Sequence, residues 1–175
     1  FVTGIASEYN GGGTAVIKTT DEIKLTGNNS IGIYTTGSGI QDIENTGHIE
    51  VGNSTDLTNP SIAIYNVNDK NSITNTGTIK TGEKALVIYN NKGTVTERGT
   101  LDIGNSGVGI YSDGGNVTID NTGAVKIGTN EAVGIYAKNN AVVQNNLTGI
   151  TIGKGSYGFI AESGSDITNT ALQTL

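Results

Sequence analysis

The chain of 175 residues contains no cysteine, methionine or tryptophan and only one proline. The absence of cysteine excludes disulfides, thiol chemistry and cysteine-based metal sites. With 27 glycines but a single proline, the composition argues against collagen and polyproline structures. Charged residues make up only 15% of the chain. This low charge, together with frequent isoleucine and valine, argues against simple disorder.

No stretch approaches the roughly 20 apolar residues of a membrane-spanning helix, so we expect no membrane insertion by this segment. The net charge of −6 argues against nucleic acid as a partner, because a binder needs a basic surface. Abundant glycine, asparagine and threonine favour turns and strands over helices. The chain has no initiator methionine and no signal peptide. We therefore expect residues 1–175 to be one all-β segment of a longer repeat protein.

The main positive feature of the chain is an internal repeat. The dipeptide Ile-Tyr recurs with its tyrosines 31, 24, 22 and 25 residues apart. Each repeat holds three short alternating segments, typified by residues 133–136, 117–121 and 125–127. Apolar residues at every second position predict strands with one buried face. Three strands in each repeat predict a right-handed parallel β-helix of about seven rungs.

A column of charges supports this register. In the aligned repeats, the outward position of the third strand carries Lys24, Glu50, Lys80, Asp102, Lys126 and then the neutral Thr151. The signs alternate along the column. Opposite charges on neighbouring strands contribute about 0.2–1 kcal/mol, whereas like charges repel.

An asparagine column is predicted at one corner of the coil. Its members are Asn45, Asn75, Asn121, Asn145 or Asn146, and Asn169. Stacked amides can hydrogen-bond along the coil, so we interpret this column as a structural ladder rather than a polar binding strip. Glu97 occupies one of its places, and Arg98 beside it is the expected charge partner.

A tyrosine column is the first candidate binding site, formed by Tyr34, Tyr65, Tyr89, Tyr111 and Tyr136. Strand alternation points these rings outward. The residues two positions earlier are small and are expected to face outward too: Gly32, Ala63, Val87, Gly109 and Gly134. Together they predict a shallow aromatic shelf suited to a sugar or a partner loop. The alternative is that the stacked rings only seal the edge of the sheet.

The longest turn, residues 52–60, is the second candidate, with Asn53, Asp56 and Asn59 as its binding residues. It is several residues longer than its counterparts and contains the only proline. Loops that project from a rigid scaffold are common recognition sites. A tolerated insertion without function is the alternative.

No catalytic site, metal site or cofactor is predicted. Glycoside cleavage needs two carboxyl groups about 5–10 Å apart, yet Glu50 and Asp102 alternate with lysines. The only histidine, His48, is expected to be an exposed turn residue rather than a base or a metal ligand. Neither G-x-S-x-G nor H-E-x-x-H occurs.

Residues 121–128 (NTGAVKIG) and 132–137 (AVGIYA) resemble the β-helical repeats in passenger domains of bacterial type V autotransporters, most of all the very large adhesins of fusobacteria. The resemblance extends from about Gly4 to Thr170. It implies an exported, cell-surface segment, translocated by an outer-membrane β-barrel outside this chain, that attaches to host cells or other bacteria. Passage across the membrane in an unfolded state would explain the missing cysteines. The resemblance transfers no catalytic residue.

Three functions follow from these patterns: an adhesin, a carbohydrate-active enzyme and a pure spacer. We expect the adhesin, with a host cell-surface protein or glycan, or another bacterial surface, as its partner. We also expect a monomer whose unpaired strand edges permit weak end-to-end contacts.

Overall fold

The structure is a computed structural model that describes residues 2–120 and 123–170. This part of the chain forms twenty β-strands and no helix. It therefore contains no helix long and apolar enough to cross a membrane. The strands form three parallel sheets, and each sheet takes every third strand of the chain.

The first sheet contains β1 (Thr3–Glu8), β4 (Ile31–Thr36), β7 (Ile62–Asn66), β10 (Leu86–Asn91), β13 (Val108–Asp113), β16 (Val133–Lys138) and β19 (Tyr157–Ala161). The second sheet contains β2 (Thr14–Thr19), β5 (Ile40–Asn45), β8 (Ser72–Asn75), β11 (Thr94–Glu97), β14 (Asn116–Ile119), β17 (Val142–Asn145) and β20 (Asp166–Asn169). The third sheet contains β3 (Glu22–Leu25), β6 (His48–Val51), β9 (Thr78–Thr81), β12 (Thr100–Ile103), β15 (Ala124–Ile127) and β18 (Ile150–Ile152).

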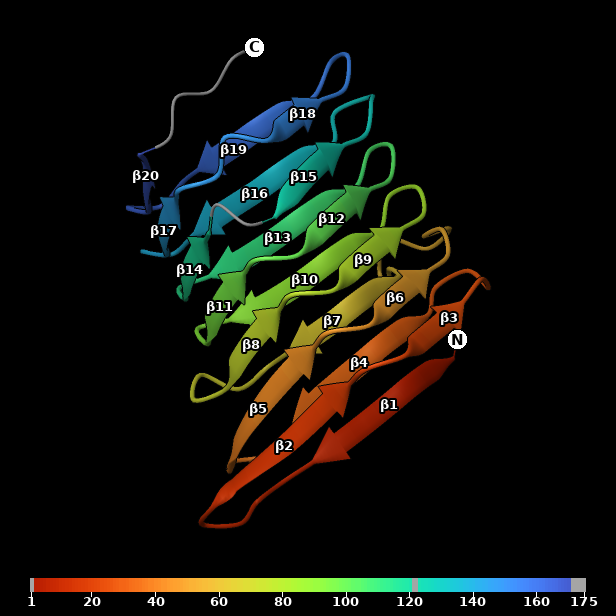
Figure 1. The fold of residues 1–175 in the computed structure, drawn as a ribbon, viewed down its shortest axis with the longest axis vertical. Helices are drawn as coiled ribbons and strands as arrows, with labels where there is room; N and C mark the ends of the chain where they lie inside the picture. Colours follow the sequence, from red (N-terminus) through yellow and green to blue (C-terminus); the bar gives the residue numbers. More distant parts are fainter. Residues whose placement is uncertain (1, 121–122, 171–175) are drawn as a thin grey trace.

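The three sheets are the sides of a solenoid. The chain passes through one strand of each sheet and then returns one strand higher, at a spacing of about 4.8 Å. Six rungs are complete in the described residues, and β19 and β20 contribute to a seventh. Figure 1 shows the strands rising in sequence order from one end of the rod to the other. The predicted parallel β-helix with three strands per rung is confirmed.

The core consists of inward columns from all three sheets. The first sheet contributes the isoleucines of the Ile-Tyr pairs, such as Ile64 and Ile88, and these are fully buried. The second and third sheets contribute residues such as Val95 and Leu101. Because each rung places the same kind of side chain above the last, a core only a few side chains wide is closed by mostly aliphatic residues.

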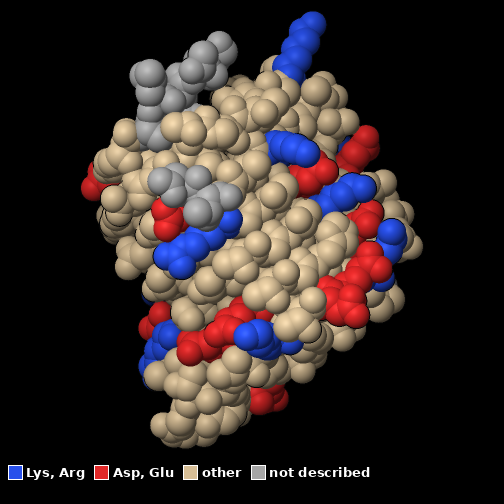
Figure 2. Space-filling view, in the orientation of Figure 1, with Lys and Arg blue, Asp and Glu red and all other residues tan. Residues whose placement is uncertain are grey.

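The charge column confirms the predicted register of the third sheet. Lys24, Glu50 and Lys80 occupy paired positions on neighbouring strands, and Asp102 and Lys126 continue the column to Thr151. The Glu50 carboxylate lies 3.2 Å from the Lys24 ammonium and 3.4 Å from the Lys80 ammonium. These lysines lower the pKa of Glu50. Figure 2 shows positive and negative side chains next to one another, without a large patch of one sign.

The expected strip of small outward residues is wrong. Gly32, Ala63, Val87, Gly109 and Gly134 share a column, but Ala63 and Val87 belong to the core cluster. A Cβ atom added to Gly109 would lie 2.6 Å from Cδ1 of Ile103, a core residue of the third sheet. Two successive residues therefore face inward where each strand of the first sheet turns around the corner. Strict alternation, which the prediction assumed, fails there.

The asparagine column exists in the second sheet but differs from the prediction in its middle. Its paired positions are Asn45, Asn75, Glu97, Ile119, Asn145 and Asn169. Ile119 occupies the place predicted for Asn121, which lies outside the described residues. Of the two alternatives left open by the sequence, Asn145 rather than Asn146 is in the column. The extra residue after it lies in the corner, where Leu147 is buried.

The ladder is a chain of amide hydrogen bonds with a carboxyl group at one step. Asn45 Nδ2 donates to Asn75 Oδ1 at 2.7 Å, and Asn75 Nδ2 donates to Glu97 Oε1 at 2.8 Å. The expected pairing of Glu97 with Arg98 is wrong, because the Arg98 guanidinium points outward to Asp120 at 3.1 Å. Burial raises the pKa of Glu97 to about 8, although hydrogen bonds from Asn75 and Gly99 act to lower it.

A second buried ladder lies on the inner side of the first sheet and was not predicted. Thr35 Oγ1 donates to Asn66 Oδ1 at 3.1 Å, Asn66 Nδ2 to Asn90 Oδ1 at 3.1 Å, and Asn90 Nδ2 to Ser112 Oγ at 3.4 Å. All four residues are fully buried. Each of the four directly follows a tyrosine of the repeat. The tyrosine column and this ladder therefore lie on opposite sides of the same strands.

Candidate functional site

The tyrosine column projects from the outer side of the first sheet, as predicted. Tyr34, Tyr65, Tyr89, Tyr111 and Tyr136 occupy directly paired positions on five successive strands. Neighbouring ring centroids are 5.0–5.4 Å apart. Each ring therefore contacts the ring of the next rung.

The orientation of the rings changes along the column. Tyr89, Tyr111 and Tyr136 are stacked, with interplanar angles of 7° and 9°. Tyr65 instead stands at 86° to Tyr89 and at 49° to Tyr34. Stacked rings cover one another's faces and leave mainly their edges and hydroxyl groups exposed. Burial raises the pKa of Tyr89, and the neighbouring Tyr65, Asp113 and Tyr111 raise it further.

An aliphatic column lies beside the tyrosines, in place of the small residues that were expected there. It contains Ile31, Ile62, Leu86, Val108 and Val133, which occupy paired positions at the start of successive strands. These residues lie outside the core cluster. Ile31 and Ile62 are nevertheless only 6% and 4% exposed, so other parts of the chain cover them.

The long turn is the segment beside these two residues. Ten residues separate β6 from β7, whereas four separate β9 from β10. Its base is closed by a hydrogen bond from the Ser61 amide to Ser54 Oγ at 2.9 Å. Asn29, one rung below, donates to Thr55 Oγ1 at 3.0 Å and accepts from the Thr55 amide at 2.9 Å. The turn is therefore attached to its neighbouring rung.

The two sequence-predicted sites meet in one hollow, which we call the tyrosine groove. It has a volume of about 350 Å³. Its lining consists of Ile31, Ile62, Leu86, Tyr65, Tyr89, Tyr111, Thr58, Asn59 and Pro60. None of the described residues that line it carries a charge. The aliphatic and tyrosine columns form the floor, and residues 58–60 of the turn form a wall.

The structure separates the predicted site residues into three groups. Tyr65, Tyr89, Tyr111 and Asn59 line the groove, whereas Tyr34 and Tyr136 lie beyond it on the same column. The remaining two, Asn53 and Asp56, shape the turn.

Asn53 accepts a hydrogen bond from the Glu83 amide at 2.8 Å, which attaches the turn to the rung above. Asp56 accepts from the side chain of Asn59 at 2.9 Å and from the backbone amide of Thr58 at 2.9 Å. These bonds lower the pKa of Asp56, the bond from Asn59 having the largest effect. Both residues therefore act on the groove indirectly, by holding its wall in place.

A second hollow of about 460 Å³ lies at the corner between the first and second sheets and was not predicted. It is lined by Gly37, Ser38, Val67, Asn68, Asp69, Lys70, Asn91 and Lys92. The Lys70 ammonium donates to the Ser38 carbonyl oxygen at 3.4 Å. Its lining is polar and includes charges of both signs on flexible side chains. The tyrosine groove, although smaller, offers the more apolar surface.

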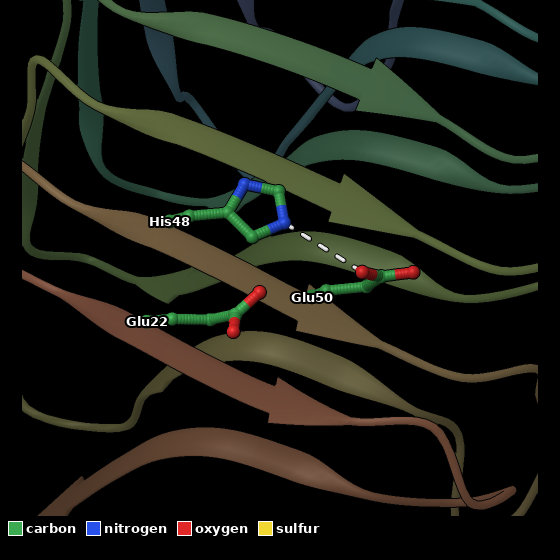
Figure 3. Close-up of side chains that lie close together, drawn as sticks. All are labelled: Glu22, His48 and Glu50. Atoms are coloured by element: carbon green, nitrogen blue, oxygen red, sulfur yellow. Dashed lines mark ion pairs between the residues drawn. The ribbon is translucent and has the colours of Figure 1, made fainter.

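One group of possible metal ligands occurs in the described residues, on the third sheet. Glu22 on β3 and His48 and Glu50 on β6 place ligand atoms within 4.8 Å of one another (Figure 3). His48 is thus a strand residue, and its expected place in an exposed turn is wrong. Its Nε2 lies 3.6 Å from Glu50. Since Lys24 and Lys80 contact opposite oxygens of the Glu50 carboxylate, these positive groups would compete with a cation.

The chain was compared with models of protein families, with curated proteins and with solved structures, and none of them matches it.

Proposed function

We propose that this chain is an adhesive segment of a surface-displayed autotransporter passenger and that the tyrosine groove binds an apolar part of a protein partner. The resemblance of the repeats to such passengers supports the cellular setting. The observation that carries the binding role is the convergence of the tyrosine column and the long turn on one uncharged groove.

The chemistry of the groove favours an apolar side chain over a sugar. Sugars stack on exposed aromatic faces, but the faces of Tyr89 and Tyr111 cover each other. The half-buried Leu86, together with the edges of Tyr65 and Tyr89, suits an aliphatic or aromatic side chain of a partner loop. Such an anchor in a desolvated pocket commonly dominates the affinity of a protein interface. Asn59 and the tyrosine hydroxyl groups can bond to the backbone around it.

An attachment assay with matched tyrosine variants tests this proposal. Bacterial and host cells are exposed to the immobilised chain, and a glycan array is probed in parallel. We expect Tyr65→Ala and Tyr89→Ala each to weaken cell attachment at least tenfold, or about 1.4 kcal/mol, because each removes part of the groove floor. Tyr136→Ala, on the same column but outside the groove, is the control and should change attachment less than twofold.

Three outcomes would contradict the proposal. Equal attachment by all three variants would place the contact elsewhere, and no attachment by the parent chain to any cell, including cells that display the chain, would favour the spacer. Binding to an array glycan that depends on Tyr65 and Tyr89 would replace the protein partner with a carbohydrate.

A further inference from the structure

The chain carries an exposed apolar side chain directly beside its apolar groove. Leu57 is 74% exposed, the highest value among the exposed large apolar residues of 2–120 and 123–170. It lies in the long turn, immediately before residues 58–60, which form the groove wall. Leu57 is not among the described residues that line the groove of its own chain. An exposed leucine next to an unfilled apolar hollow suggests that each serves another molecule.

The turn holds Leu57 in a defined position. On one side, Asp56 accepts hydrogen bonds from the Thr58 amide at 2.9 Å, from Thr58 Oγ1 at 2.7 Å and from Asn59 Nδ2 at 2.9 Å. On the other side, Asn29 accepts bonds from the amides of Thr55 and Asp56 at 2.9 and 3.2 Å. A side chain displayed on such a preorganised turn loses less conformational entropy on binding than one on a mobile loop.

We propose that the tyrosine groove receives Leu57 from a second copy of this chain. Leu57 directly precedes the wall residues 58–60 of the groove, so a two-fold axis beside this wall would bring each leucine to the groove of the other copy. Such a self-complementary arrangement closes as a dimer and does not extend into a filament. In this dimer the groove binds a leucine side chain, which matches its uncharged lining of Ile62, Leu86 and Tyr89.

The charge of the chain predicts how this dimer responds to salt. Each copy carries a net charge of −6, so two copies repel each other at low ionic strength. The contact itself contains apolar groups and depends little on salt. Screening of the repulsion should therefore strengthen the dimer as ionic strength rises. An association held by ion pairs would respond in the opposite direction.

The inference depends on the proposed function in one respect: it takes the groove as the binding site and names its partner. Cells that display the chain would then attach to one another through paired copies. Attachment to a surface that lacks the chain is not required by this arrangement.

Sedimentation equilibrium of the 175-residue chain tests the inference. We expect the apparent mass to rise with concentration toward that of a dimer, and to rise further with added salt. Leu57→Asp should weaken the dimer at least tenfold, because it places a charge in the partner's apolar groove. Val16→Asp is the matched control, since Val16 is also exposed, at 61%, but lies on the second sheet. It should leave the dimer unchanged.

Cysteine trapping provides a second test, because the natural chain has no cysteine. A Leu57→Cys variant mixed with a Leu86→Cys variant should form a mixed disulfide under mild oxidation. A Leu57→Cys variant mixed with Val16→Cys should form at least tenfold less. Because the disulfide accumulates from even a weakly populated dimer, this readout tolerates a loss of affinity in either variant.

A constant monomer mass at all concentrations would overturn the inference. A dimer that Leu57→Asp and Val16→Asp weaken equally would also overturn it, as would a dimer that persists in both variants. In either case, association would use the ends of the rod or another surface. If Leu57→Asp has no effect but Tyr65→Ala still loses cell attachment, only this inference fails. If Tyr65→Ala and Tyr89→Ala retain attachment, the proposed function itself fails.

Discussion

The two sides of the first sheet carry columns built from consecutive residues, yet the columns differ in kind. On the outer side, tyrosine rings contact one another at angles that range from 7° to 86°. On the inner side, Asn66 and Asn90 are fully buried and hydrogen-bond directly from rung to rung. The outer column varies in ring orientation along the rod, whereas the inner column keeps a hydrogen bond at each step from Thr35 to Ser112.

The difference follows from what each environment permits. A buried amide without a partner costs about 1–3 kcal/mol, so the inner column keeps a hydrogen bond at each step from Thr35 to Ser112, beyond which the apolar Ala137 follows. An exposed ring loses little when it turns, and Tyr65 stands nearly perpendicular to Tyr89 where the long turn approaches. The inner columns therefore stabilise the register of the rungs, while the outer column is free to form a binding surface.

The largest expected effect concerns the only carboxyl group in the inner amide ladder of the second sheet. The pKa of Glu97 is raised from 4.5 to about 8, so the folded chain keeps a proton that the unfolded chain releases. Stability should therefore fall as the pH rises from about 4.5 to about 8, and should level off above that. At about 1.4 kcal/mol for each pKa unit, the loss amounts to several kcal/mol.

Urea unfolding at pH 5 and pH 9 measures this loss. Glu97→Gln replaces the carboxyl group with an amide that stays neutral, so it should remove most of the pH dependence in this window. Glu44→Gln is the control, because Glu44 is an exposed glutamate on the second sheet that pairs with Lys18 at 3.2 Å. Equal pH dependence in the parent chain and in Glu97→Gln would show that the inner column tolerates a charge.

A smaller effect is expected from removing one amide of the inner ladder on the first sheet. Asn66→Ala leaves Thr35, Asn71 and Asn90 without their shared hydrogen-bond partner. We expect a loss of about 2–4 kcal/mol in the free energy of unfolding, measured by urea denaturation. Tyr65→Phe, a change to the neighbouring residue on the outer side, should cost less than about 0.5 kcal/mol. Similar losses in both variants would remove the distinction between the two columns.

The smallest effect is expected within the outer column. Tyr111→Ala removes two stacked contacts, with Tyr89 and Tyr136, and should cost about 1–3 kcal/mol at 0.5–1.5 kcal/mol per pair. Tyr34→Ala removes one tilted contact, with Tyr65, and should cost about half as much. Thermal unfolding of the two variants measures the difference. A greater loss from Tyr34→Ala would mean that stacking does not stabilise the outer column.

Much of the fold could be predicted because the repeat makes each position a column. Alternating charges from Lys24 to Lys126 identified the register of the third sheet, and that register is confirmed. The predictions failed at corners, where alternation stops. Gly32 and Ile33 both face inward, and the corner after Ile119 holds two more residues than the corner after Glu97. A linear pattern contains no signal for how a corner accommodates an extra residue.

The candidate site could be predicted only in parts. The tyrosines and the long turn were each identified, but nothing in the chain indicated that residues 58–60 lie against Tyr65 and Tyr89, since their contact depends on the path of the turn. The inner ladder of Asn66 and Asn90, which directly follow two of the tyrosines, was not predicted. Four of the five column tyrosines are followed by a polar residue, namely Thr35, Asn66, Asn90 and Ser112, and this was the signal that could have revealed it.

The sequence by itself determined the three strands of each rung and the side of the sheet on which the tyrosines lie. These properties depend on local periodicity, which side-chain burial enforces at every repeat. Only the tertiary structure decided that the aliphatic column replaces the small strip, that Glu97 is buried without Arg98, and that the long turn forms a groove wall. Such features arise where corners and turns of different rungs meet. Their geometry depends on packing between residues more than twenty positions apart, which no local pattern records.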